Sequence, residues 1–549
     1  MSWPYHLVSL SSDQKHERRA LLARYGSYAQ LSALIPILGY QLFLLGRWVY
    51  LRATRPGTAY SAVSQPSDHR RSQLGRRPFY AVLRTWRIAA WWLNDELGPG
   101  WGLRQHWIAG AIWSIWMLFL CVHRTGDDYL HVTKRLGIVA AAQFPLHYML
   151  AMKSRYSPLV FLFRTSHERL NPWHRLSGRV ISLLLALHAA GYINYYIQSD
   201  KLAKLRSRAS VTGLIAIALL TLLTATTLDR VRNRTYRVFF TSHLAAAILL
   251  PPILFFHVEH LRIYILETLL VYAFDRVTRR LSTVSVPAHI TRIPRTNLLR
   301  LHLALPADKL RLYRAAPAQH VNLSLPAETA PSLLHRYICN PFSVADVPNN
   351  GLTLVVRPRG GPMTRALDAR AESSPANVSI EGPLGATRWF PDLSSKFDRV
   401  LIVAGGVGGT FAVPVYRELR AQLESELKGA ERVSLVWAVK SIDEVRWAVR
   451  GGDEGWLQDE NVRVYVTGSE RWRDGDDGVE MSEMCGSIPV GTRGRPNLTA
   501  VVDATFSYGD GDRVAVLFCG PQGMARDLRA CVRRWAGRDI WWYEERFGW

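Results

Sequence analysis

Long apolar segments of helical length dominate the first half of this chain. They lie at about residues 29–51, 105–122, 134–152, 174–196, 211–228, 236–257 and 261–278. About 20 predominantly apolar residues are enough for an α-helix to cross the hydrocarbon core of a bilayer. The sequence therefore predicts a multi-pass α-helical membrane bundle with seven spans.

Basic residues are concentrated in the same half. Residues 1–280 contain 35 Lys and Arg against 13 Asp and Glu, whereas residues 281–549 contain 33 against 31. Basic loops between apolar segments are typical of the cytoplasmic side of a membrane protein. The basic connections that fall on one predicted side are 47–104, 153–173 and 229–237. We therefore place the C-terminal half in the cytosol, although the basic loop 197–210 lies on the outer side. No nucleic acid is expected, because the charges form no stripe.

Two histidine pairs share one unusual spacing. His174 and His188 are 14 residues apart in one predicted span, and His243 and His257 are 14 apart in another. Fourteen residues make nearly four helical turns and rise about 21 Å, so both members of a pair face one direction. One span separates the two helices, so they run parallel, and His174 meets His243 while His188 meets His257. This arrangement fits two b-type haems, each with its iron held by two imidazoles. The alternative is that these histidines are only polar residues near helix ends.

The pattern changes at about residue 283. Short alternating segments predict an antiparallel β-barrel. From residue 396, buried strands alternate with helices, which predicts a parallel, doubly wound α/β sheet. The chain thus divides into 1–104, 105–282, 283–395 and 396–549. The first part holds the first transmembrane helix and a basic cytoplasmic loop.

Two glycine-rich turns follow strands of the predicted parallel sheet. VAGGVGGT at 403–410 opens a helix, and CGPQGM at 519–524 follows a later strand. Such turns let the backbone approach a pyrophosphate, and a helix N-terminus favours its charge. Together they predict a dinucleotide site, although tight packing alone can also require glycine.

These features resemble the fungal transmembrane ferric reductases, a group in the superfamily that includes the NADPH oxidases. The motifs that carry the resemblance follow the family's order: the two histidine pairs, YICNPFSVAD (337–346), GGPMTRAL (360–367), EGPLG (381–385), AGGVGGT (404–410), LVWAVK (435–440), GRP (494–496), CGPQGM (519–524) and EERFGW (544–549). The resemblance covers about 174–549. It implies that a transmembrane domain with two haems is followed by an FAD-binding barrel and a Rossmann-like NADPH-binding domain of the ferredoxin-reductase type.

The resemblance also implies particular site residues. FAD would contact Asn340, Pro341, Phe342, Ser343, Arg357, Gly361, Thr364 and Trp549. NADPH would contact Gly405, Gly406, Gly408, Gly409, Thr410, Lys440, Cys519, Gly520, Pro521 and Met524, with Lys440 at the 2′-phosphate. Asn340 stands where the family has His, and Leu384 where it has Tyr, so we expect activity with an altered affinity for flavin or a variant substrate profile. No catalytic side chain is expected beyond the cofactors.

The implied activity is that of an NADPH-dependent ferric-chelate reductase. Electrons would pass from cytosolic NADPH through FAD and two haems to ferric iron, or to ferric or cupric chelates, in support of iron uptake. A superoxide-producing NADPH oxidase with the same electron path is the alternative, and a non-catalytic membrane scaffold is a third reading. Asp127, Asp128 and the loop 197–210 are candidate outer contacts for the acceptor. We expect the protein to be embedded in the lipid of the plasma membrane, with the vacuolar membrane as the alternative. Whether an iron permease or an oxidase is its partner is left open.

Overall fold

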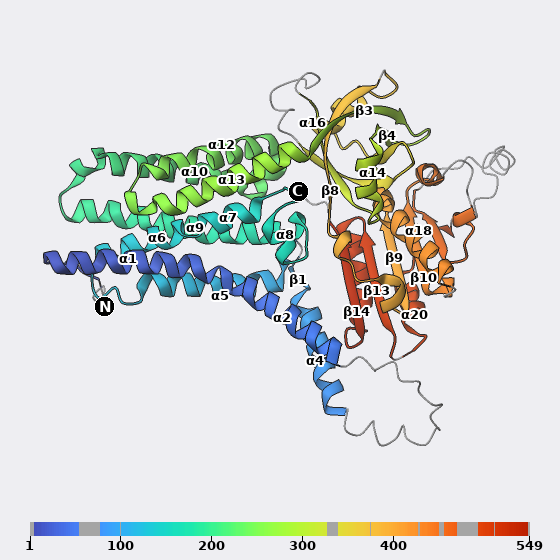
Figure 1. The fold of residues 1–549 in the computed structure, drawn as a ribbon, viewed down its shortest axis with the longest axis horizontal. Coiled ribbons are helices and arrows are strands. Elements are labelled where there is room, and N and C mark those ends of the chain that lie inside the picture. The colour runs from blue at the N-terminus through green and yellow to red at the C-terminus, as the bar shows by residue number, and fades with distance from the viewer. Residues whose placement is uncertain are drawn as a thin grey trace. The chain divides into compact units, whose positions relative to one another are not determined.

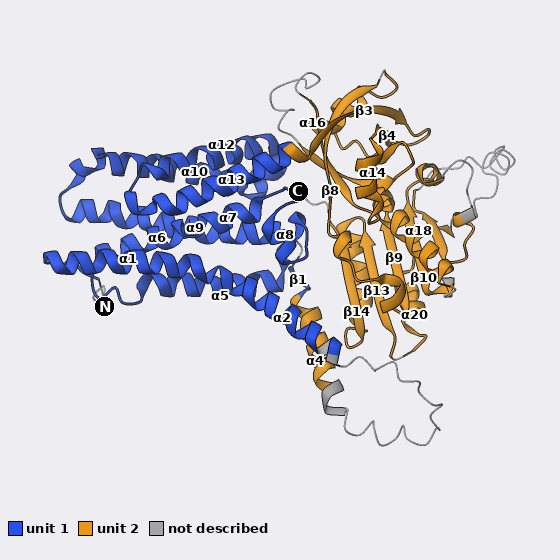
Figure 2. Cartoon of the chain, viewed as in Figure 1, with its two compact units in different colours: residues 1–64, 94–280 blue, residues 65–93, 281–549 orange. Residues whose placement is uncertain are grey.

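The computed structural model describes residues 5–53, 77–98, 100–326, 339–373, 375–426, 429–449, 455–468, 492–509 and 511–546. The chain forms two compact units (Figures 1 and 2). The first contains residues 1–64 and 94–280, and the second contains residues 65–93 and 281–549.

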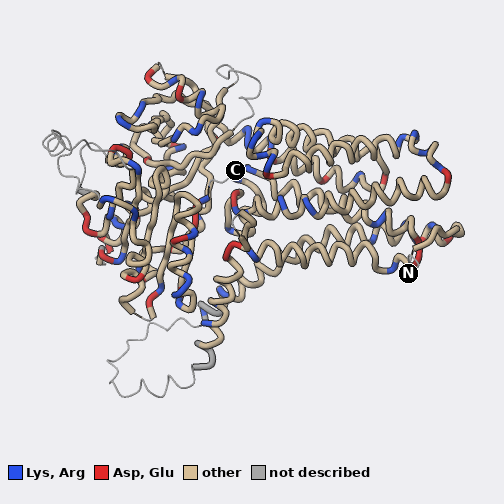
Figure 3. The backbone as a smooth tube through the Cα atoms, turned by 180° about the vertical axis from the view of Figure 1, so that it is seen from behind, with Lys and Arg blue, Asp and Glu red and all other residues tan. Residues whose placement is uncertain are grey.

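The first unit is a helical bundle. Its helices are α1 (Ser12–Ser32), α2 (Leu34–Ala53), α5 (Arg104–Val122), α6 (Tyr129–Ala141), α7 (Phe144–Ala151), α8 (Pro158–Leu162), α9 (His167–Gln198), α10 (Arg208–Thr227), α11 (Asp229–Arg234), α12 (Tyr236–Phe255) and α13 (Arg262–Ser282). A short hairpin, β1 (Glu96–Gly98) with β2 (Gly102–Leu103), precedes α5, and 3-10 turns lie at Leu202–Arg206 and Glu259–Leu261. In Figure 3, the charged residues of this unit lie mostly toward its helix ends.

Five stretches of helix among the described residues are long and apolar enough to cross a membrane. They are Ser12–Val49, Arg104–Val122, His167–Gln198, Arg208–Thr227 and Tyr236–Phe255. The seven predicted spans and these five stretches differ at two places. The segment 134–152 is divided between α6 and α7, because Pro145 in the first turn of α7 has no N–H to continue a helix. Helix α13, which begins at Arg262, contains nearly all of the predicted span 261–278, but its charged residues lower its hydropathy.

The second unit begins with the predicted antiparallel barrel, which the structure confirms. Its strands are β3 (Thr283–Arg292), β4 (Leu299–Ala304), β5 (His320–Ser324), β6 (Asn340–Asp346), β7 (Gly351–Val356) and β8 (Ala376–Leu384), closed in the order β3-β4-β7-β6-β5-β8. Alternate side chains point inward along β3, so this strand contributes Val286, Ala288 and Ile290 to the barrel core. Two helices, α14 (Ala307–Arg314) and α16 (Pro362–Asp368), connect strands.

The predicted parallel α/β sheet is confirmed as well. Its strands are β9 (Arg399–Gly405), β10 (Val433–Val439), β11 (Val462–Val466), β12 (Thr492–Arg493), β13 (Arg513–Cys519) and β14 (Asp539–Glu545), and its helices are α17 (Leu393–Lys396), α18 (Gly409–Ser425), α20 (Leu498–Phe506) and α21 (Gln522–Arg533). The strand order is β12-β11-β10-β9-β13-β14, with parallel pairing throughout. Successive strands run outward from β9 to β12, and the chain then returns to the other side of β9. Ligands of such sheets bind outside the carboxyl ends of the strands at this reversal point.

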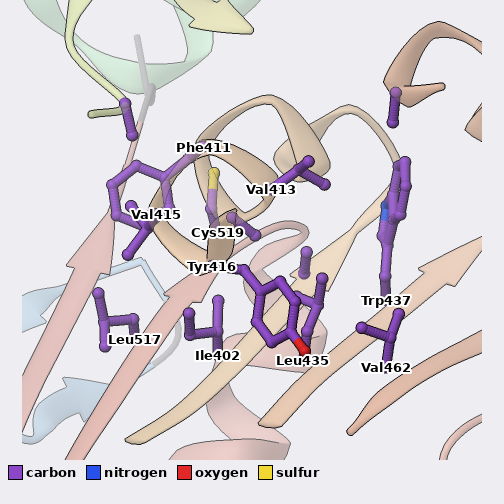
Figure 4. Close-up of a cluster of buried hydrophobic side chains, with 14 of the residues drawn as sticks. Ile402, Phe411, Val413, Val415, Tyr416, Leu435, Trp437, Val462, Leu517 and Cys519 are labelled. Carbon is purple, nitrogen blue, oxygen red and sulfur yellow. The ribbon is translucent and has the colours of Figure 1, made fainter. Parts of the chain in front are cut away.

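The core of the α/β domain holds the ends of these strands in place. Figure 4 shows Phe411, Val413, Val415 and Tyr416 of α18 near strand residues such as Ile402 and Leu435. Phe411 and Ile402 have no exposed surface. Because α18 follows directly after β9, this packing fixes where the turn between them lies.

Helix α4 (Arg77–Leu93) belongs to the second unit, although we expected a basic loop here. Its Trp91 is only 8% exposed and joins the core cluster that contains Val501, Phe506 and Leu528. A segment that precedes α5 in the chain therefore packs on the α/β domain.

Candidate functional site

The four predicted histidine ligands lie on or beside two helices of the bundle. His174 and His188 are in α9, and His243 is in α12. His257 lies two residues beyond the end of α12, so it does not share a regular helix with His243 as the spacing argument assumed. The rings of His174 and His243 are 6.1 Å apart between centroids, with 70° between their planes. His188 and His257 lie close enough to interact electrostatically.

Three of these four imidazoles hold their Nδ1 atoms on backbone carbonyls. The bonds join His174 to His147 O (3.2 Å), His188 to Thr133 O (2.7 Å) and His257 to Ala209 O (2.7 Å). A carbonyl oxygen can only accept, so each Nδ1 carries the proton and each Nε2 keeps a free lone pair. Histidines that bind metal usually show this arrangement, because the second bond orients the ring. The buried Nδ1 of His243 has no hydrogen-bond partner among the described residues.

The donor set fits a haem. Two imidazoles on opposite sides of one metal ion, each at about 2 Å, have ring centres roughly 6 Å apart. The separation of His174 and His243 agrees with this value. Within the described ranges, no three His, Cys, Asp or Glu side chains gather into a group that could hold a metal. A pair of histidines whose metal takes its other ligands from a macrocycle would fit these residues.

Two helix glycines leave uncovered the backbone carbonyls that accept hydrogen bonds from His188 and His257. A Cβ atom on Gly137 of α6 would lie 2.7 Å from His188 Cε1, and one on Gly213 of α10 would lie 2.8 Å from His257 Cε1. Gly137 is four residues after Thr133, and Gly213 is four after Ala209. In an α-helix the carbonyl of residue i faces residue i+4, so glycine there leaves room for a second donor. Sequence reasoning missed both, although glycine inside an apolar helix, which costs about 1 kcal/mol against alanine, is a usable signal.

His147 is another residue that the sequence did not single out. Its ring stacks on the His174 ring, with 4.1 Å between centroids and 17° between planes. Its Nδ1 is 2.8 Å from Ser177 Oγ, while its carbonyl accepts from His174. His147 thus positions His174 through both its ring and its backbone.

The outer residues proposed as acceptor contacts differ in their surroundings. Asp128 is 5% exposed, caps α6 through the His131 N–H at 3.0 Å and lies 3.8 Å from Arg18. It is therefore a buried helix cap and not a solvated loop residue. The basic side chains of the loop 197–210 are exposed: Lys201, Lys204, Arg206 and Arg208.

The predicted flavin residues lie at the beginning of strand β6 and after strand β7. Asn340, Pro341, Phe342 and Ser343 begin β6, and Ser343, 7% exposed, pairs with His320 of β5. Gly361 precedes α16, and the Thr364 hydroxyl donates to its carbonyl at 3.2 Å. Trp549 lies outside the described residues.

Arg357 follows β7 and points at the α/β domain. Its guanidinium forms an ion pair with Glu444 at 2.6 Å, and a Cβ on Gly406 would lie 3.3 Å from its Nη1. This arginine therefore lies against the first glycine turn, and one of its guanidinium N–H groups already donates to the Glu444 carboxylate.

The two predicted glycine turns touch one another at the ends of β9 and β13. A Cβ on Gly408 would lie 2.0 Å from Cys519 O, and one on Gly405 would lie 2.5 Å from Pro521 Cδ and 3.3 Å from Met524 Sδ. A Cβ on Gly409 would lie 2.4 Å from the Trp437 ring, and one on Gly520 would lie 2.9 Å from Gly405 N. Packing alone therefore requires these four glycines. Gly406 is required by its backbone conformation, with φ at +56°.

The remaining predicted nucleotide residues surround this point of reversal in the sheet. Lys440 is exposed directly after β10, the strand next to β9. The Thr410 hydroxyl donates to Val407 O at 2.8 Å in the first turn of α18. Burial raises the pKa of the Cys519 thiol, which disfavours its thiolate form.

Two family models match parts of this chain; His257 and the predicted flavin residues between 340 and 364 lie outside both matched ranges. Residues 136–254 match the ferric reductase like transmembrane component, and residues 397–533 match the ferric reductase NAD binding domain. Together with the five apolar helices, the first match makes the chain an integral membrane protein.

Several fungal proteins are similar to the chain. A probable ferric reductase transmembrane component of Eremothecium gossypii is 29% identical over 65% of this chain and 54% of its own length. A probable metalloreductase AIM14 of Meyerozyma guilliermondii is 23% identical over 77% of this chain and 86% of its own length. Ferric reductase transmembrane component 6 of Saccharomyces cerevisiae is 26% identical over 75% of this chain and 59% of its own length. The chain thus spans little more than half of the first of these relatives. Two parts of the chain are similar to the ferric reductase family models, and the chain is similar in sequence to fungal proteins named ferric reductase or metalloreductase.

Proposed function

We propose that this protein is a transmembrane metalloreductase of the plasma membrane with its nucleotide-binding domain in the cytosol. It takes electrons from NADPH and delivers them, by way of FAD and two haems, to ferric iron or to ferric or cupric chelates outside, in support of iron uptake. The observation that carries the proposal is the histidine arrangement. Four imidazoles lie at two levels of a bundle. In three of them, Nδ1 donates to a backbone carbonyl, which leaves the Nε2 lone pair available to a metal.

Each group of residues has a defined task in this proposal. His174 and His243 would hold one haem and His188 and His257 the other, and FAD, when bound, would supply the change from two-electron to single-electron chemistry that iron requires. The carbonyls of residues 133, 147 and 209 keep the imidazoles in one tautomer.

The α/β domain supports the choice of a nicotinamide donor. Its two glycine turns meet at the reversal point of the strand order, where sheets of this kind bind nucleotides. Lys440 stands directly after the adjacent strand β10, and we assign it to the 2′-phosphate of the ribose. Because this lysine would contact the 2′-phosphate that NADH lacks, we propose NADPH as the electron donor.

The test is reduction of an extracellular ferric chelate by cells that express the chain, with and without superoxide dismutase. His257→Ala is compared with His260→Ala, which removes a nearby exposed imidazole outside the proposed pairs. We expect His257→Ala to abolish reduction, His260→Ala to retain it, and the dismutase to have no effect. Reduction that the dismutase abolishes would make oxygen the acceptor and the protein an NADPH oxidase. If His257→Ala reduces as fast as wild type, the proposed electron path is wrong.

A further inference from the structure

Helix α4 is held to the α/β domain by one of its faces. The Trp91 side chain is buried there, and its ring meets the Trp542 ring edge-on at 5.7 Å. The Arg529 guanidinium lies 4.3 Å from the centre of the Trp91 ring. Arg87 forms an ion pair with Asp539 at 3.0 Å. The aromatic and ionic contacts together fix the orientation of the helix on this domain.

The opposite face of α4 is apolar and exposed. The exposed fractions are 67% for Val82, 66% for Trp86, 46% for Ile88 and 46% for Trp92. At 100° per residue, these four side chains lie within one arc of about 160°. The other exposed residues inside this arc are Ala81, Thr85 and Ala89. A helix on the surface of a soluble domain normally turns its polar face outward, so the pattern of α4 is the reverse of that expected in water.

The chain keeps α4 near the membrane. Only ten residues separate Leu93, at the end of α4, from Arg104, at the start of the candidate span Arg104–Val122. Ten extended residues reach at most about 36 Å. Trp101, 64% exposed, and Trp107, 39% exposed, stand at the beginning of that span. Tryptophans of this kind mark the level of the lipid headgroups.

Arginines border the apolar face. A groove of about 200 Å³ next to α4 is lined by Arg84, Arg533 and Arg534 together with Ile88 and Trp92. Arg534 also pairs with Asp503, at 2.6 Å. Apolar side chains flanked by guanidinium groups match the interface of a bilayer, where acyl chains lie beneath anionic phosphates.

We propose that α4 is an interfacial membrane-binding helix. Its apolar face enters the headgroup region of a bilayer that contains anionic lipid, and its other face carries the α/β domain. The inference goes beyond the proposed function, because it depends on neither the cofactors nor the electron acceptor.

Nitroxide labels on the full chain in lipid nanodiscs test this. Labels are placed at Val82→Cys and Trp86→Cys, both in the exposed arc. The matched control is Ala421→Cys, an exposed position of α18. The wild-type chain, treated in parallel, gives the background from its own cysteines. Collision rates with oxygen and with a polar nickel chelate are measured in phosphatidylcholine, with and without phosphatidylserine.

We expect the ratio of oxygen to nickel collisions at 82 and 86 to exceed the ratio at 421 several-fold, and phosphatidylserine to raise it further. Labels at 82 and 86 that meet the nickel chelate as often as the label at 421 would place this face in water. Labels shielded from both probes would mean that protein covers it. Either result overturns the proposal, and an unchanged ratio with phosphatidylserine would remove the role given to the arginines.

Discussion

Gly137→Ala is expected to displace His188, one of the proposed haem ligands, while the fold remains. The new Cβ would lie 2.7 Å from both Cε1 and Nδ1 of His188, about 0.7 Å inside the 3.4 Å at which ordinary contact begins. The ring cannot retreat freely, because its Nδ1 is bonded at 2.7 Å to Thr133 O on the same helix. Functional side chains must be held to within about 0.5 Å of their productive position. The required shift exceeds that tolerance.

The cost of the substitution can be bounded from the same contacts. If the ring moves, the lost hydrogen bond costs about 1 kcal/mol. If α6 moves instead, overpacking costs about 1–3 kcal/mol. Replacing glycine by alanine inside a helix returns about 0.5–1 kcal/mol. The net loss is small against the stability of a domain, so the variant should still fold and be inserted.

The assay is haem content per chain, measured as the pyridine haemochrome of purified protein, together with the absorbance of the oxidised and reduced forms. The haem content of Gly137→Ala should fall from two haems per chain to one. Gly213→Ala acts on His257, the other proposed ligand of the same haem, and should give the same result. The double variant should also keep one haem. Gly39→Ala is the control, because a Cβ there would have nothing within 4 Å.

Two outcomes would refute this reasoning. If Gly137→Ala retains two haems and the absorbance of the wild type, His188 either is not an axial ligand or adjusts without cost. If each single variant loses one haem and the double variant loses both, the two histidines do not serve one haem. Melting temperatures of all variants would separate loss of haem from general unfolding.

Three further predictions concern the second unit. Gly408→Ala should abolish NADPH binding by the full chain in equilibrium titration, because its Cβ would lie 2.0 Å from Cys519 O, whereas Gly523→Ala, with nothing within 4 Å, should bind normally. Lys440→Ala should raise KM for NADPH about tenfold and leave KM for NADH unchanged in steady-state kinetics, since a charge-assisted hydrogen bond is worth about 1.5–3 kcal/mol. Burial lowers the pKa of His302 below 6.5, so the unfolded chain binds its proton more tightly; stability should fall as the pH drops below 6.5, and His302→Gln should weaken this dependence in thermal unfolding.

The fold was largely predictable because its signals are local. Alternation along strands such as 283–292 predicts a barrel, and buried strands followed by helices predict the parallel sheet. Hydropathy averaged over 134–152 hides the effect of Pro145, which ends one helix and lies in the first turn of the next. Helix α4 was missed because the ten arginines of 47–104 suggested a basic loop, while Trp91 is buried by residues such as Val501 and Leu528, more than 400 positions away.

The site was predictable only in part, for a different reason. The spacing of the histidines reveals candidate ligands, but the groups that hold them are backbone carbonyls, which every residue possesses. Nothing in the identity of Thr133 or Ala209 indicates that its carbonyl accepts from an imidazole. Conversely, Gly408 was assigned to a nucleotide, yet its contact with Cys519 O requires glycine even without a ligand.

The use of carbonyls, and not carboxylates, follows from the surroundings. A carboxylate inside a membrane span would be a costly charge, whereas a helix carbonyl is neutral and already present. The carbonyl of residue i normally serves the N–H of residue i+4, and a side chain at i+4 would cover it. Glycine at positions 137 and 213 removes that cover, so one carbonyl can serve both the helix and an imidazole. Helices α6 and α10, which carry no predicted ligand, therefore decide the tautomer and the direction of both histidines at this level. A change in their packing alters the proposed metal site without touching any ligand.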